Sequence, residues 1–166
     1  MTGIGKSTAP ISEPAMTEPA KDATAPEPAA HLPRDTRDTL DAATIRALLD
    51  DFYGRVRAHP ELGPVFLASV EDWPAHMATL TDFWCTVMLA ARRYKGNPLA
   101  IHAGLASALP PGAFGALFPV WLGLWRETTR DRFPPDIAEV FITKAERIAE
   151  SLKAGLLFDP ARRPQA

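Results

Sequence analysis

The stretch GNPLAIHAGLASALPPGAFGALFPVWLGLW, residues 96–125, contains no formally charged residue. An uncharged run of this length first suggests a membrane span, which needs about 20 predominantly apolar residues in sequence. The stretch is interrupted by four prolines, Pro98, Pro110, Pro111 and Pro119. Asn97, His102 and several glycines break it further. We therefore expect short helices buried around something apolar, in a soluble protein with no membrane partner.

Helical periodicity extends on both sides of this stretch, because apolar residues recur every three or four positions. No alternating strand pattern occurs after Leu40, so the expected fold class is all-α. Asp41 and Asn97 are predicted helix N-caps, and the segment 61–66 is predicted to be a turn. The spacing predicts helices over residues 42–58, 72–93, 98–109, 112–131 and 135–157.

The first 39 residues have a different composition from the rest. They hold six of the 17 prolines, no aromatic residue and only isolated large aliphatics. Such a segment cannot bury enough apolar surface to offset its ordering entropy. We expect a disordered Pro/Ala-rich tail over 1–39, a folded domain over 40–158 and a flexible C-terminus over 159–166. The tail lacks the apolar run of a secretory signal and is too acidic for a transit peptide, so the expected location is cytoplasmic.

Composition excludes several classes of function. The formal net charge is −2, whereas nucleic-acid binding usually needs a strongly basic face. Cys85 is the single cysteine, so a disulfide framework, a Cys-rich zinc site and an iron–sulfur cluster are excluded. We expect a monomer or a weak oligomer that does not bind nucleic acid.

His102 is the most informative residue of the uncharged stretch. A lone histidine on an apolar face is usually a satisfied core residue, and metal binding is the alternative. The sequence has no HExxH, Glu-x-x-His or Cys-x-x-Cys pattern, so further metal ligands would have to come from outside the protein. A porphyrin supplies four nitrogens and needs one axial histidine, whose other nitrogen could donate to a carbonyl one turn back. Without Cys-x-x-Cys-His, any haem would be a non-covalent haem b.

The folded part also resembles a known family, the third group of the truncated haemoglobins, over about residues 45–157. The matching segments occur in the family's order with similar spacing: DFYGRV (51–56), ELGPVF (61–66), WPAH (73–76), FW (83–84), YKGNPL (94–99) with His102, and FPVWL (118–122). The resemblance implies a truncated globin, with helices packed two over two around haem.

The resemblance also implies roles for individual residues. His102 matches the proximal iron ligand, while Tyr53, Trp121 and His76 match the distal residues that face a bound ligand. The remaining residues expected to contact the cofactor are Phe52, Phe66, Leu80, Phe83, Trp84, Arg92, Arg93, Tyr94 and Leu99. Among these, the arginines and Tyr94 are expected beside the haem propionates, since guanidinium groups suit carboxylates.

Each role has a simpler alternative, and three functions stay open. Tyr53 and Trp121 could be core aromatics, His76 could be a gate or a structural residue, and Arg92 and Arg93 could form a solvated helix end. The first function is tight binding of a diatomic gas such as oxygen, NO or CO. The second is NO or peroxide chemistry with a separate reductase, and the third is a haem-free interaction module.

Overall fold

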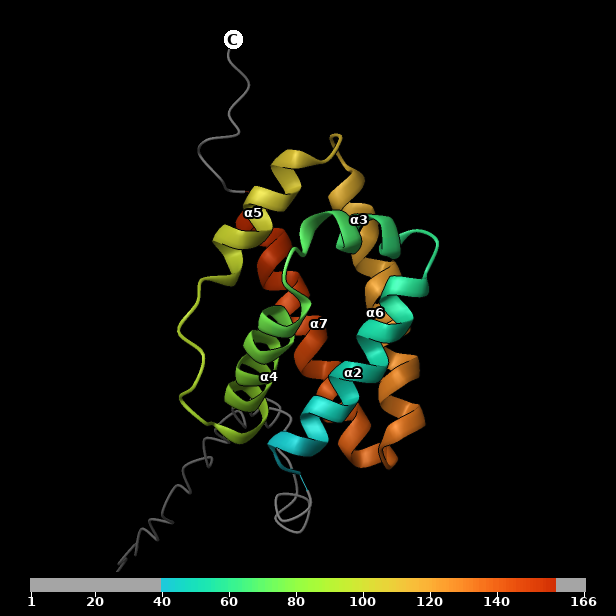
Figure 1. Cartoon of the computed structure of the whole chain (residues 1–166), viewed down its shortest axis with the longest axis vertical. Coiled ribbons are helices and arrows are strands. Elements are labelled where there is room, and N and C mark those ends of the chain that lie inside the picture. Colours follow the sequence, from blue (N-terminus) through green and yellow to red (C-terminus); the bar gives the residue numbers. More distant parts are fainter. Residues whose placement is uncertain (1–39, 158–166) are drawn as a thin grey trace, which may run out of the picture.

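The computed structural model describes residues 40–157, which form six α-helices and no strand within that range (Figure 1). The predicted all-α class is therefore confirmed. The helices are α2 (Ala42–Ala58), α3 (Leu62–Ser69), α4 (Trp73–Leu89), α5 (Pro98–Ala108), α6 (Ala113–Arg132) and α7 (Pro135–Leu157). The predicted tail 1–39 and the C-terminal segment 159–166 lie outside the described residues.

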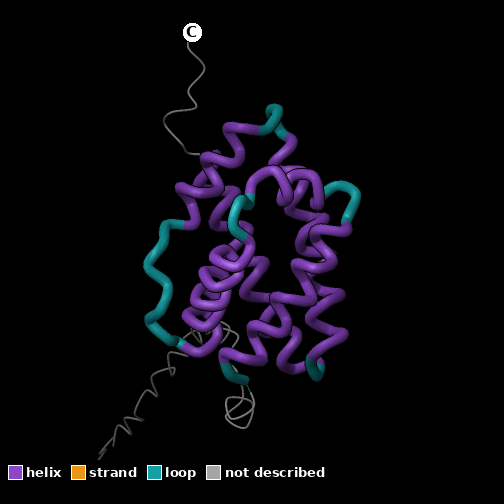
Figure 2. The backbone as a smooth tube through the Cα atoms, viewed as in Figure 1, coloured by secondary structure: helices purple, strands orange, loops and turns teal. Residues whose placement is uncertain are grey.

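The four longest helices pack in two pairs, α2 with α4 and α6 with α7, and α2 also packs on α6. The shorter α3 and α5 close one end of this arrangement. The longest connection, residues 90–97, runs along the outside of the molecule from α4 to α5 (Figure 2). Within residues 40–157, no helix combines the length and the apolar character needed to cross a membrane.

The predicted N-caps begin their helices as expected. The Asp41 carboxylate accepts from the backbone N–H of Thr44 at 2.7 Å, and the Asn97 side chain accepts from Ala100 N–H at 3.2 Å. Asp72 caps α4 in the same way, accepting from Ala75 N–H at 2.9 Å. Each cap satisfies a backbone donor that the first helical turn leaves free.

Two predicted boundaries were wrong. The segment 61–66, predicted as a turn, belongs largely to α3, because Pro64 falls in the first helical turn, where proline is tolerated. Helix α4 ends at Leu89, before the predicted 92–93, because Ala90 adopts a left-handed conformation with φ 55°. The Thr86 hydroxyl then donates to Ala91 O at 2.6 Å and accepts from Tyr94 N–H at 3.1 Å, which turns the chain away from the helix axis.

Trp125 lies at the centre of the core and is fully buried. Its indole stacks on Trp84 at a centroid distance of 4.5 Å and on Trp121 at 5.3 Å. Its Nε1–H donates to the carbonyl of Phe141 on α7 at 3.3 Å, so the buried polar atom is satisfied. The stack joins α4 and α6, the helices that carry Trp84 and Trp121.

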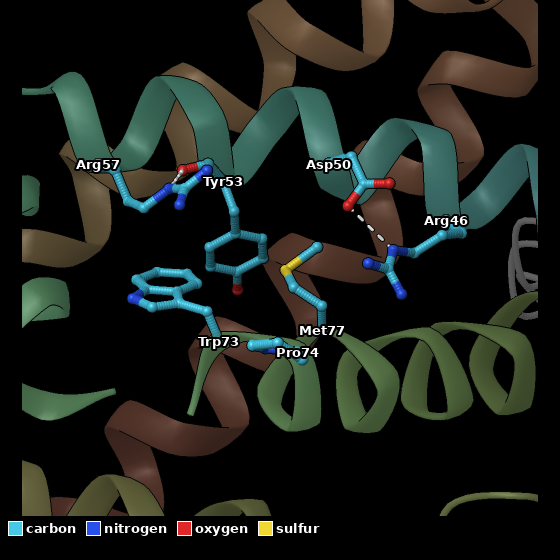
Figure 3. A pocket seen from close by; sticks show the side chains of 7 residues that line it. All are labelled: Arg46, Asp50, Tyr53, Arg57, Trp73, Pro74 and Met77. Atoms are coloured by element: carbon cyan, nitrogen blue, oxygen red, sulfur yellow. Dashed lines mark hydrogen bonds and ion pairs between the residues drawn. The ribbon is translucent and has the colours of Figure 1, made fainter. Parts of the chain in front are cut away.

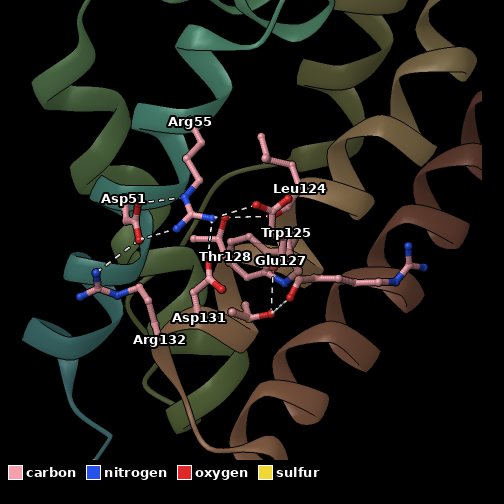
Figure 4. A network of polar contacts seen from close by, with 10 residues as sticks. Asp51, Arg55, Leu124, Trp125, Glu127, Thr128, Asp131 and Arg132 are labelled. Atoms are coloured by element: carbon pink, nitrogen blue, oxygen red, sulfur yellow. Dashed lines mark hydrogen bonds and ion pairs between the residues drawn. The ribbon is translucent and has the colours of Figure 1, made fainter.

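A polar network fastens α2 to α6 on the outer side of the core (Figure 4). The Arg55 guanidinium contacts Asp51 at 3.1 Å, Asp131 at 2.7 Å and Glu127 at 3.5 Å. Arg132 reaches Asp51 at 3.4 Å. Tyr53 lies on α2 and Trp121 on α6, so the network also supports the two helices that carry these side chains.

Candidate functional site

A cavity of about 660 Å³ lies inside the helical arrangement. This volume falls within the range of about 300–1,000 Å³ typical of cofactor and ligand sites. All six described helices contribute to its wall, and most of the wall is apolar. The aliphatic and aromatic residues that form much of it are Leu62, Val65, Phe66, Leu80, Phe83, Trp84, Ile101, Leu105, Phe114, Leu117, Phe118, Ile148 and Leu152.

His102 of α5 lines the cavity. Its Nδ1 lies 2.6 Å from the carbonyl oxygen of Pro98, one helical turn earlier. A carbonyl can only accept, so Nδ1 must carry a proton and donate it, and in the neutral ring the lone pair is then on Nε2. A neutral imidazole fixed in this tautomer is the form that binds a metal ion.

The described part of the chain brings no set of protein metal ligands together around His102. Within residues 40–157, no three His, Cys, Asp or Glu side chains come together as a metal-binding group. An iron held by His102 would therefore need the rest of its coordination from a cofactor. A large apolar cavity with a single oriented histidine fits a haem, which brings four nitrogen ligands of its own.

Tyr53 and Trp121 bring polar atoms to the cavity from α2 and α6. Burial raises the pKa of the Tyr53 phenol far above its usual value, and the nearby indole N–H of Trp121 partly opposes this shift. The phenol therefore remains protonated at neutral pH and keeps an O–H to donate. Phe52 packs edge-on against both rings, at centroid distances of 5.0 Å to each, and fixes their positions.

His76 lines the cavity from α4, with its ring 5.7 Å from that of Tyr53. Burial lowers the pKa of its imidazole, so the ring stays neutral at pH 7. Its Nε2 is buried and has no hydrogen-bond partner in the described part of the chain. Such atoms are rare in folded proteins because desolvation without a partner is costly. A ligand or a water held in the cavity would supply the missing partner.

Nine of the thirteen residues predicted from the sequence line this cavity. They are Tyr53, Phe66, His76, Leu80, Phe83, Trp84, Tyr94, His102 and Trp121. These nine residues come from five helices and one loop, and the fold brings them to one cavity, as a common binding site requires. Their position alone does not assign a role to any of the nine.

The other four predicted residues lie outside the lining. Phe52 is fully buried behind Tyr53 and Trp121. Leu99 is 41% exposed, and its side chain closely approaches the backbone of Gly155 on α7. Arg92 and Arg93 are exposed in the 90–97 connection, because α4 ends before it reaches them.

Several lining residues were not predicted as site residues. They include Leu105 on α5, Phe114, Leu117 and Phe118 on α6, and Ile148 and Leu152 on α7. Their helical spacing marks an apolar face, but that pattern is the same for a helix packed in a core and for one facing a cavity. Only the packing of α5, α6 and α7 separates the two cases.

The fold and this cavity define an all-helical protein that encloses an apolar pocket with one oriented histidine and a group of buried polar side chains. Comparisons with known proteins agree. The chain is 30% identical over 116 residues to the group 3 truncated hemoglobin ctb of Campylobacter jejuni, covering 68% of this chain and 87% of that protein. The crystal structure of a group III truncated hemoglobin from Campylobacter jejuni superimposes with a TM-score of 0.62 and 28% identity, covering 72% of this chain and 93% of the other. No family model matches the chain.

The chain belongs to the group 3 truncated haemoglobins. Membership confirms the resemblance found in the sequence and the truncated-globin fold. It also implies a haem cofactor and a diatomic gas as the ligand class, as for globins in general.

Proposed function

We propose that this protein holds a non-covalent haem b in the larger cavity, with Nε2 of His102 as the protein's iron ligand, and reversibly binds a diatomic gas. The observation that carries the proposal is the 2.6 Å contact between Nδ1 of His102 and Pro98 O, which in the neutral ring leaves the lone pair on Nε2, in a residue that lines the apolar cavity. Covalent attachment through two cysteines is excluded, because the chain has one cysteine.

When bound, haem supplies an iron with a coordination position open to a gas. The protein supplies the surroundings: the apolar wall excludes water, and Tyr53 and Trp121 each have one N–H or O–H to donate. A hydrogen bond to a charged group contributes about 1.5–3 kcal/mol. Each donor aimed at a gas that carries partial negative charge would therefore slow its release by roughly one to two orders of magnitude. The pocket favours tight binding over transport.

The first test measures visible spectra of the haem-supplied protein with and without carbon monoxide, for wild type and His102→Gly. Wild type is expected to show a Soret band that shifts with carbon monoxide. His102→Gly is expected to lose this spectrum and to regain it when free imidazole is added, because imidazole can occupy the space left by the side chain. A wild-type spectrum in the variant without imidazole would remove His102 from the proposed role.

The second test measures oxygen dissociation in wild type, Tyr53→Phe and Trp121→Phe. Each variant removes one donor, and each is expected to release oxygen about 10–100-fold faster. Leu117→Ile is the matched control, because it alters an apolar lining residue without touching a donor, and its rate is expected to stay close to that of wild type. Unchanged rates in both donor variants would contradict the proposed binding site.

A second candidate function is turnover of NO or peroxide, with electrons from a separate reductase. It is favoured by one observation: the neutral His76 has a buried Nε2 without a hydrogen-bond partner in the described part of the chain, and its ring lies beside that of Tyr53. A neutral imidazole has one nitrogen that can accept a proton. Steady turnover of peroxide with an external reductant is expected to fall by about 10²-fold or more in His76→Leu. If turnover is absent in wild type, this candidate is excluded and gas binding is retained.

A further inference from the structure

A second, smaller cavity of about 240 Å³ lies between α2 and α4, outside the large one (Figure 3). Its wall is formed by Arg46, Asp50, Tyr53, Arg57, Trp73, Pro74 and Met77. Tyr53 is the one residue of the described chain that lines both cavities. The Tyr53 ring points from α2 towards α4, between Trp73 and Met77 (Figure 3). It therefore forms part of the partition between the small outer cavity and the large inner one.

Trp73 completes this partition. Its indole lies 6.2 Å from the Tyr53 ring and 5.7 Å from the His76 ring, so it covers both residues on the side of the outer cavity. It does not itself line the inner cavity. Trp73 is also the first residue of α4, directly after the cap Asp72. A side chain in a first helical turn has no preceding turn beside it and is freer to change rotamer than one in the helix interior.

Arg57 lies over the outer face of the Trp73 ring, with its guanidinium carbon 4.9 Å from the ring centroid. Its Nε donates to the backbone carbonyl of Tyr53 at 3.3 Å. Arg57 is exposed, and a cation over an aromatic ring is only weakly attractive at an exposed site. This contact favours the observed position of the Trp73 ring but is weak enough to allow the ring to rotate.

We propose that the outer cavity is a route by which small ligands reach the distal residues, and that Trp73 is its gate, held closed by Arg57. Rotation of the Trp73 indole leaves Tyr53 alone between the two cavities. The ligand class is the uncharged diatomic gas of the proposed function, on which this inference rests. The charged residues at the mouth do not oppose such a ligand, since Arg46 and Asp50 form an ion pair at 2.9 Å.

A gate and a contact residue differ in their kinetics. A gate changes the barrier for passage in both directions and leaves the free energies of the bound and free states unchanged. A residue that contacts the bound gas changes the dissociation constant instead. The test is therefore carbon monoxide binding to the haem-loaded protein, followed by flash photolysis for association and by ligand replacement for dissociation.

Trp73→Ala is expected to raise the association and dissociation rates of carbon monoxide by the same factor, about threefold or more, so the dissociation constant stays unchanged. A smaller fraction of the photodissociated carbon monoxide is expected to rebind before it leaves the protein. Arg57→Met, which keeps most of the packing but removes the charge, is expected to raise both rates by a smaller factor. It also keeps the proposal testable if Trp73→Ala folds poorly. The matched control is Leu67→Ala, which shortens an exposed apolar side chain on α3 that lines neither cavity and is expected to leave both rates unchanged.

Three results would overturn the proposal: unchanged rates in both Trp73→Ala and Arg57→Met, a rise in Leu67→Ala equal to that in Trp73→Ala, or a change in dissociation alone. The second would make the rise a general effect of shortening an exposed apolar side chain, and the third would make Trp73 a contact of the bound gas. If wild type shows no carbon monoxide spectrum, the proposed function itself fails, and this outcome is recorded before any rate is compared.

Discussion

Burial fixes the protonation state of the polar side chains in the large cavity. It raises the pKa of Tyr53 and lowers that of His76, so each favours its uncharged form at pH 7. Tyr53 is then a hydrogen-bond donor, and His76 carries one donor and one acceptor nitrogen. A cavity with uncharged polar groups selects ligands by hydrogen bonding rather than by net charge.

The depressed pKa of His76 predicts a dependence of stability on pH. Below its ordinary pKa of 6.5, the unfolded chain takes up a proton that the folded chain does not. This linkage makes the free energy of unfolding fall as the pH decreases from 6.5 towards the folded-state pKa. Above 6.5, neither state is protonated and the effect disappears.

Denaturant unfolding of wild type and His76→Gln between about pH 5 and 8 measures this effect. The wild type is expected to lose stability more steeply than the variant below pH 6.5, and the two curves are expected to run parallel above it. Because the other histidines are common to both proteins, the difference isolates His76. Parallel curves throughout would mean that His76 keeps its ordinary pKa in the fold.

At the residue scale, nine of the thirteen site residues predicted from the sequence line the large cavity, and four lie outside its lining. Eight of the nine lining residues lie on helices whose phase is set by a strong apolar periodicity, as for Tyr53 on α2 and Trp121 on α6, while Tyr94 lies in the 90–97 connection. Arg92 and Arg93 were expected beside the haem propionates because guanidinium groups suit carboxylates, and they lie in the 90–97 connection, outside the cavity lining. The left-handed Ala90 ends α4 before these residues, and nothing in the identity of an alanine signals this conformation.

At the scale of the elements, α3 approaches the end of α2 so closely that only glycine fits at the contact. A Cβ at Gly63 would lie 2.6 Å from the backbone carbonyl oxygen of Arg57. Backbone cannot move aside as a flexible side chain can. This close approach places Phe66 of α3 beside Tyr53, at a ring distance of 5.8 Å.

Gly63→Ala is expected to destabilise the protein by about 1–3 kcal/mol, since overpacking forces the backbone to shift. Gly54→Ala is the matched control on α2, because a Cβ there meets no atom within 4 Å. In a helix interior this change is expected to stabilise by about 0.5–1 kcal/mol. Denaturant unfolding measures both. A Gly63→Ala protein as stable as wild type would show that α3 can move away from α2 without loss.

The elements were predicted well where a polar cap and an apolar stripe agree, as at Asp41 for α2 and Asn97 for α5. Helix α3 was missed because Gly63 and Pro64, adjacent in the sequence, are typical of a turn. Its helical conformation depends on packing against α2, including the contact of Phe66 with Tyr53 at a ring distance of 5.8 Å. Tertiary contacts of this kind have no local signal.

In the molecule as a whole, the core and the cavity wall depend on different helices. Helices α2, α4, α6 and α7 bury large side chains such as Phe52, Trp84, Trp125 and Phe141 in one core. In contrast, α5 buries only Ala106 and α3 only Leu62 and Gly63. Much of the apolar surface of the two short helices faces the cavity, so their stability depends on what fills it.

Amide hydrogen exchange is therefore expected to divide the protein into two groups of helices. In haem-free protein, α3 and α5 are expected to exchange quickly, while the centres of α2, α6 and α7 remain protected. Adding haem is expected to slow exchange in α3 and α5 by about tenfold or more, since a bound ligand stabilises the folded state. Equal protection of α5 with and without haem would contradict this division.

The stack of Trp84, Trp121 and Trp125, with Trp73 against Tyr53, has a consequence for spectroscopy. All four tryptophans of the chain belong to this aromatic cluster, and two of them, Trp84 and Trp121, line the large cavity. A porphyrin placed there would take up their excitation energy before they emit. The intrinsic fluorescence of a preparation would then come almost entirely from molecules without cofactor, and its intensity would measure the fraction that remains unloaded.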